Sequence, residues 1–111
     1  MEKAIIGLIE DIKIISNNKG ELFKAKIDTG ADTSSLDLSI ATRLNLKLVG
    51  MASIKSAAGK SKRGKVTARI ILAEKEMDAE FTIADRSDMN FPVLIGKNIL
   101  TKGFLIDPTK E

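Results

Sequence analysis

The residue types best suited to chemistry lie together in one short segment, Asp28-Thr29-Gly30-Ala31-Asp32, which follows directly on the apolar Ile27. Glycine lets a backbone turn sharply and lets a second chain or a substrate approach closely. A carboxylate beside such a turn can be oriented by backbone amides, which suits acid–base chemistry better than a mobile surface position. The segment therefore predicts Asp28 as a catalytic residue, although Asp-Thr-Gly is also an ordinary turn sequence.

Whole classes of catalyst are excluded by the residue types that the chain lacks. The 111 residues include no His and no Cys. Ser–His–Asp and Cys–His systems cannot be built, because the base and the thiol are missing. A zinc site is disfavoured for the same reason, since Zn²⁺ is held mainly by Cys and His, and we expect no metal and no cofactor. Carboxylates are the best remaining catalysts.

The elements that must position this segment are mostly β-strands. Residues 5–15 are rich in β-branched side chains, and apolar and polar residues alternate near 23–27, 66–72 and 77–83, which is the period of half-buried strands. Ser16-Asn17-Asn18-Lys19-Gly20 predicts a hairpin turn, and Glu74-Lys75-Glu76 a tight polar turn. Short helices are expected over 40–44, capped by Asp37 or Ser39, and from Asn98 toward Gly103. We expect one all-β domain over residues 1–111 with one or two short helices.

A second apolar strand ends at a glycine in the segment Ile95-Gly96-Lys97-Asn98-Ile99-Leu100. Together with Asp28-Thr29-Gly30-Ala31-Asp32, this segment resembles the retropepsin-like aspartic proteases. That family has an apolar strand into Asp-Thr-Gly-Ala, a flap hairpin, and an apolar strand into Ile-Gly-Arg-Asn-Leu-Leu. The resemblance extends over nearly the whole chain. It implies a retropepsin-like acid protease fold, which is a closed, β-barrel-like single lobe with a flap hairpin.

A narrower resemblance begins at Asp85-Arg86-Ser87-Asp88 and continues to Phe104-Leu105-Ile106-Asp107-Pro108. These residues are similar to those of a prokaryotic retropepsin-like group whose members are often labelled ATP-dependent zinc proteases. The zinc in that label does not fit this chain, because the oxygen ligands that remain favour Mg²⁺ or Ca²⁺. We interpret Asp85-Arg86-Ser87-Asp88 as a polar loop with an internal ion pair.

One Asp-Thr-Gly implies two chains. An aspartic protease needs two carboxylates that share a proton, one acting as base toward water and the other as acid toward the scissile carbonyl. The chain is too short for two lobes, so we predict a C2 homodimer with Asp28 of each subunit on the axis. The predicted function is a homodimeric aspartic endopeptidase that acts on extended peptides. The alternative is a non-catalytic peptide- or protein-binding module on the same fold.

The resemblance also implies roles for the neighbouring residues. Thr29 would hydrogen-bond across the dimer axis, and Gly30 would contact the substrate backbone. Ala31 stands where pepsin-like relatives have serine, and losing that hydroxyl implies activity at higher pH than pepsin's. Asp32 would pair with Lys97, which stands where the family has arginine and cannot form a bidentate fork.

The flap hairpin is expected over 54–66, with its tip near Ala57, Ala58, Gly59 and Lys60 as a cover for the substrate. Its basic residues are Lys55, Lys60, Lys62, Arg63 and Lys65. These five exceed the chain's formal net charge of +3, so the rest of the chain is mildly acidic. The lysines could serve solubility alone. The functional interpretation is a flap that closes over an acidic peptide or docks on an anionic partner.

Other partners are disfavoured by composition. The aromatic fraction is 4%, with no Tyr or Trp, which leaves little for stacking on nucleic-acid bases. No segment approaches the roughly 20 apolar residues of a membrane-spanning helix. No secretory signal is evident, so we expect a cytoplasmic protein without a membrane partner.

Overall fold

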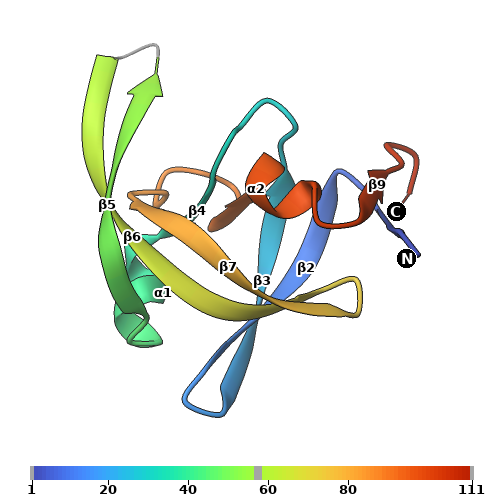
Figure 1. The fold of residues 1–111 in the computed structure, drawn as a ribbon, viewed down its shortest axis with the longest axis horizontal. Helices are drawn as coiled ribbons and strands as arrows, with labels where there is room; N and C mark the ends of the chain where they lie inside the picture. The colour runs from blue at the N-terminus through green and yellow to red at the C-terminus, as the bar shows by residue number, and fades with distance from the viewer. Residues whose placement is uncertain (1, 57–58, 111) are drawn as a thin grey trace.

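The computed structural model describes residues 2–56 and 59–110, and in them the chain forms nine strands and two short helices (Figure 1). In chain order these are β1 (Ala4–Ile6), β2 (Ile9–Ser16), β3 (Lys19–Ile27), β4 (Ser34–Asp37), α1 (Leu38–Arg43), β5 (Lys47–Ser56), β6 (Gly59–Leu72), β7 (Lys75–Ala84), β8 (Val93–Ile95), α2 (Lys97–Leu100) and β9 (Phe104–Ile106). No helix among the described residues has the length and apolar character needed to cross a membrane.

The main sheet closes on itself. Its strands follow the order β2-β3-β8-β4-β7-β6, and β2 pairs with β6 as well, so that these strands form a closed barrel. Across this closure Ile12 faces Leu72 and Ile14 faces Ile70, and all four side chains are fully buried. The alternation in the sequence directs these apolar side chains inward. The expected all-β fold, a closed single lobe with a flap hairpin and short helices, is confirmed.

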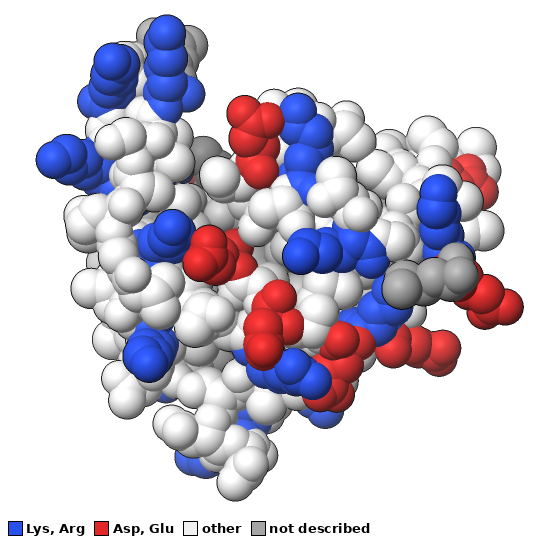
Figure 2. All heavy atoms as spheres, viewed as in Figure 1, with Lys and Arg blue, Asp and Glu red and all other residues white. Residues whose placement is uncertain are grey.

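The flap is the hairpin of β5 and β6, which stands away from the barrel (Figure 1). It is longer than the predicted 54–66, because pairing continues from Ser56↔Gly59 to Lys47↔Thr67, with a bulge between Leu48 and Gly50. Lys60 lies directly opposite Lys55. Ala57 and Ala58, the first half of the predicted tip, lie outside the described residues. Figure 2 shows basic side chains gathered on this hairpin, at upper left.

Most predicted local features are present. Asn17 and Asn18 have positive φ in the β2–β3 turn, as expected for this sequence. Asp37, rather than Ser39, caps α1, and its side chain accepts a hydrogen bond from the backbone of Ser39. The predicted turn at Glu74-Lys75-Glu76 was wrong in position. The two turn residues with positive φ are Ala73 and Glu74, and Lys75 already belongs to β7.

The first and last strands lie side by side. β1 and β9 form a parallel pair in which Ile5 faces Leu105 (Figure 1). Ile6 and Phe104 point into the core, whereas Ile5 and Leu105 are exposed. Backbone hydrogen bonds from Ala4 to Gly103 and from Asp107 to Ile6 extend the pairing at both ends.

Candidate active site

Asp28 follows the last residue of β3 and is held by the backbone on two sides. Its own N–H donates to the carbonyl oxygen of Ile95 on β8 at 2.9 Å. Its Oδ1 accepts a hydrogen bond from the N–H of Gly30, also at 2.9 Å. The carboxylate is thus oriented by the tight turn that the sequence predicted. It is only half-buried, and Thr29 and Gly30 beside it are exposed.

The second motif, Ile95-Gly96-Lys97-Asn98-Ile99-Leu100, is hydrogen-bonded through its backbone to the Asp28 loop, which comprises residues 28–33 between β3 and β4. β3 and β8 run parallel with Ile27 opposite Ile95, so the two motifs leave the sheet at the same edge. The first amides of α2 then donate to the loop, Lys97 to the carbonyl of Ala31 at 2.8 Å and Asn98 to that of Asp32 at 3.2 Å. These carbonyls take the place of a capping side chain at the start of the helix, since Gly96 has none to offer.

Gly96 lies where the two motifs touch most closely. A Cβ at this position would lie 2.4 Å from the carbonyl oxygen of Thr33 and 2.8 Å from that of Ala31. Both neighbours are backbone atoms of the Asp28 loop, so they cannot turn aside as a flexible side chain would. Glycine is therefore required at position 96 because the two backbones lie too close for a Cβ. Its φ of −105° is an angle that any residue can adopt, so backbone conformation is not the reason.

Side-chain hydrogen bonds of Ser34 and Asn98 also join the end of the Asp28 loop to the second motif. The Ser34 hydroxyl donates to Asn98 Oδ1 at 2.7 Å and accepts from the N–H of Gly96 at 2.9 Å. Asn98 Nδ2 donates in turn to the carbonyl of Glu80 at 3.0 Å. Asn98 was among the predicted site residues, but Ser34 was not. Its only signal in the sequence is a hydroxyl side chain directly after the loop, where burial could not be foreseen.

Asp32 and Lys97 form the ion pair that the sequence led us to expect. Lys97 Nζ lies 2.9 Å from Asp32 Oδ1. The Asp32 side chain is 87% exposed in the single chain, so the pair is surrounded by water and contributes little to the stability of the monomer.

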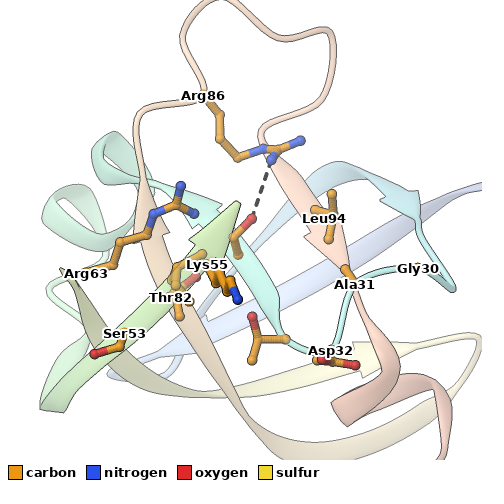
Figure 3. Close-up of a pocket in the computed structure, with 12 residues that line it drawn as sticks. Gly30, Ala31, Asp32, Ser53, Lys55, Arg63, Thr82, Arg86 and Leu94 are labelled. Atoms are coloured by element: carbon orange, nitrogen blue, oxygen red, sulfur yellow. Dashed lines mark hydrogen bonds between the residues drawn. The ribbon is translucent and has the colours of Figure 1, made fainter. Parts of the chain in front are cut away.

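A cavity of about 510 Å³ lies between the Asp28 loop and the flap (Figure 3). The loop contributes one wall, the flap a second, and β4, β7, β8 and the segment after β7 the remainder. Its lining residues are Gly30, Ala31, Asp32, Thr33, Ser35, Ser53, Ile54, Lys55, Arg63, Thr82, Arg86 and Leu94. Three of these are cations and one, Asp32, is an acid that already pairs with Lys97. The predicted loop and part of the predicted flap therefore meet across one cavity of positive character.

Arg86 does not form the internal ion pair that we expected of its loop. No ion pair joins it to Asp85 or Asp88 in the part of the chain that the structure describes. Asp85 instead accepts hydrogen bonds from the backbone and hydroxyl of Ser87, and the hydroxyl bond is the main reason why the pKa of Asp85 is lowered. Arg86 is 7% exposed and turns inward to the cavity. The polar character of the loop gave no signal of this burial.

Asp37 ties the same loop to β4 and α1. Its Oδ1 accepts a hydrogen bond from the N–H of Arg86 at 2.7 Å, and its Oδ2 accepts from the backbone and the hydroxyl of Ser39. These bonds, with the Ser39 hydroxyl first among them, lower the pKa of the Asp37 carboxyl. The ionised carboxylate therefore favours the folded state.

We expect Asp37→Asn to lower the free energy of unfolding by about 1–2 kcal/mol at pH 7, because asparagine offers one acceptor oxygen where both carboxylate oxygens are used. A lowered pKa stabilises the fold above the unfolded-state pKa, near 3.8, and this contribution is lost as the pH falls through the folded-state value. The difference should thus shrink below about pH 4. Thermal melts at pH 7 and pH 2.5 measure it, with the exposed Asp88→Asn as control. An equal difference at both pH values would contradict this account.

Metal ligands do not gather here. Within residues 2–56 and 59–110, no group of three or more acidic side chains lies close enough together to hold a metal ion. The residues present do not fit a zinc site, since none of them offers an imidazole or a thiolate.

Comparisons with known proteins found a matching family model, a more distant relative and a solved structure. A family model described as "RimB-like: Retropepsin-like aspartic endopeptidase RimB" matches residues 37–111, which include the second motif and Arg86 but begin after the Asp28 loop. A protein named "Probable alpha-L-glutamate ligase" from Shewanella pealeana is 26% identical over an alignment 114 residues long, which covers 79% of this chain. The chain spans only 25% of that relative's length.

A solved structure shows the same fold. It is the crystal structure of Lpg0085, a protein of unknown function from Legionella pneumophila, and it matches with a TM-score of 0.67 at 22% identity. The match covers 96% of this chain and 95% of that one.

Proposed function

Because the chain belongs to the RimB-like family of retropepsin-like aspartic endopeptidases, we propose that it is a homodimeric aspartic endopeptidase. It hydrolyses peptide bonds with a water molecule activated by one aspartate, Asp28, from each subunit. The observation that carries this proposal is the Asp28 carboxylate, which the N–H of Gly30 orients on an accessible loop beside a large cavity.

The chemistry requires a second carboxylate that one chain does not supply. In the dimer, two Asp28 side chains meet on the axis, and like-charge repulsion leaves one ionised and one protonated. The ionised group takes a proton from water, and the protonated one donates to the scissile carbonyl oxygen. Thr29 is exposed on this loop, and we expect it to hydrogen-bond with its counterpart across the axis, as the family's pattern implies.

The substrate is an extended peptide with acidic residues. An extended chain can pair with exposed strand backbone along the cleft, as in β-strand addition. The cavity carries Lys55, Arg63 and Arg86, and more lysines follow along the flap. A positive cleft attracts acidic chains and raises their rate of association.

The test combines oligomeric state with cleavage. The protein should sediment as a dimer and should cleave members of a diverse peptide library between about pH 4 and pH 7, the range in which one carboxylate of a pair is ionised. Mass spectrometry of the products identifies the cleaved bonds. A dimer that binds peptides but cleaves none across this range would contradict the proposal and support a non-catalytic peptide-binding module.

A further inference from the structure

Ser34, the first residue of β4, carries a hydroxyl group that is fully buried beside the second motif. Its Oγ donates to Asn98 Oδ1 at 2.7 Å and accepts from the N–H of Gly96 at 2.9 Å. The proposed reaction does not use this hydroxyl. A buried hydroxyl is costly unless its hydrogen bonds are made, so these two partners are what stabilise a serine at this position.

One peptide group connects the Ser34 hydroxyl to the backbone of Asp28. The carbonyl of Ile95 and the N–H of Gly96 belong to the same planar amide. The carbonyl accepts a hydrogen bond from the N–H of Asp28 at 2.9 Å, and the N–H donates to Ser34 Oγ, also at 2.9 Å. Because the amide is rigid, a rotation that released the Ser34 hydroxyl would also disturb the bond to Asp28. The hydroxyl therefore fixes the carbonyl that holds the Asp28 backbone.

Asn98 sets the direction in which this hydroxyl points. Its Nδ2 donates to the carbonyl of Glu80 on β7 at 3.0 Å. A carbonyl oxygen can only accept, so the amide nitrogen of Asn98 must face Glu80 and the amide oxygen must face Ser34. The proton of the hydroxyl then points to Asn98, which leaves a lone pair for the N–H of Gly96. Through these two side chains, β7 supports the Asp28 backbone.

We propose that Ser34 and Asn98 are positioning residues that hold the Asp28 backbone where the two carboxylates of the dimer share a proton. This role rests on the proposed function. Two-fold symmetry makes the position demanding, because a displacement of the loop occurs in both subunits and counts twice in the separation of the carboxylates. A misplacement of about 1 Å can lower a rate about 100-fold. Neither side chain is among the described residues that line the cavity, so peptide binding does not depend on them.

Cleavage of the best library peptide by Ser34→Ala and Asn98→Ala tests this role. We expect kcat to fall about 10–100-fold in each variant, with KM within about threefold of the wild-type value. The two losses should not multiply in the double variant, because both residues act on the same peptide group. Ser34→Thr keeps the hydroxyl and should restore most of kcat. Asn98→Asp, which loses the donor to Glu80, should lower kcat like Asn98→Ala and carries the test if Ser34→Ala unfolds.

The matched control is Ile70→Val, which removes a buried methyl group where β6 closes the barrel against β2. It lowers stability without touching the loop, so kcat and KM should be unchanged when they are measured well below the melting temperature. Equal effects of Ser34→Ala and Ile70→Val on kcat would reduce Ser34 to a structural residue and overturn the proposal. Losses that multiply in the double variant, or a loss confined to KM, would overturn it too.

Amide hydrogen exchange measures the same contact without turnover. Ser34→Ala should speed exchange of the Asp28 N–H about 10-fold relative to the core amides of β2, as for the loss of about one hydrogen bond. Ile70→Val should not single out this amide. The two proposals therefore fail separately. Faster exchange in Ser34→Ala, together with a wild-type dimer that cleaves no peptide, would remove the endopeptidase function and leave the support of Asp28 standing. An active wild-type dimer with neither kcat nor exchange changed in Ser34→Ala would do the reverse.

Discussion

We expect Asp28→Asn to abolish peptide cleavage and to leave the protein folded and dimeric. Asparagine keeps the size of aspartate and an Oδ1 that can still accept the hydrogen bond from the N–H of Gly30, so the loop retains its shape. It cannot take a proton from water or pass one to a carbonyl oxygen. Because general acid–base groups contribute about 10²–10⁴-fold to rate, we expect kcat/KM to fall by at least this factor.

The measurement is the initial rate of cleavage of the best library peptide, with sedimentation and thermal melting as checks on assembly and fold. Asp11→Asn is the matched control, because Asp11 is an exposed carboxylate on β2 whose ion pair with Lys24 lies on the surface. It should keep full activity. Full activity in Asp28→Asn would remove Asp28 from the mechanism and the shared-proton pair with it.

Gly96→Ala destabilises the fold and displaces the Asp28 loop. The new Cβ would meet the carbonyl oxygens of Thr33 and Ala31 at 2.4 and 2.8 Å, and each of these belongs to backbone that cannot rotate away. We expect the free energy of unfolding to fall by about 2–3 kcal/mol, as for overpacking at a close contact. Activity should fall as well in the variant that remains folded, since the hydrogen bonds from α2 to the loop carbonyls must lengthen.

Urea unfolding measures the stability of this variant against Gly64→Ala. At Gly64 the nearest atoms to a new Cβ are the methyl ends of Leu48 and Ile83, at 3.1 and 3.3 Å, and both side chains can move. The control should therefore lose less than about 1 kcal/mol. Equal effects at the two glycines would show that the contact between the motifs is not rigid.

Local sequence patterns predicted most of the fold and the loop that holds Asp28. Alternation predicted strands such as β6 because one face of the strand lies in the barrel, as Ala68 and Ile70 show. The spacing of the two motifs, through the family resemblance, predicted the pairing of Asp32 with Lys97. These features depend on residues close in sequence or on a pattern shared by many chains.

The inner wall of the cavity could not be predicted in this way. Arg86 and Ser35 are polar residues in polar surroundings along the chain, and only the folded structure buries them. Arg63 was visible as one of several flap cations, but its direction depends on the register of β6 against β5. Which cations face the cavity is therefore a property of the assembled hairpin rather than of its composition.

The parallel pairing of β1 with β9 sets where the lobe can be attached to other polypeptide. Both ends of the described chain emerge at one corner, next to α2 and away from the flap (Figure 1). A fusion partner or an affinity tag at either end leaves the mouth of the cavity unobstructed. The same proximity makes circular permutation feasible: a short linker can join the two ends, and new termini can open at the Asn17–Asn18 turn without cutting the barrel.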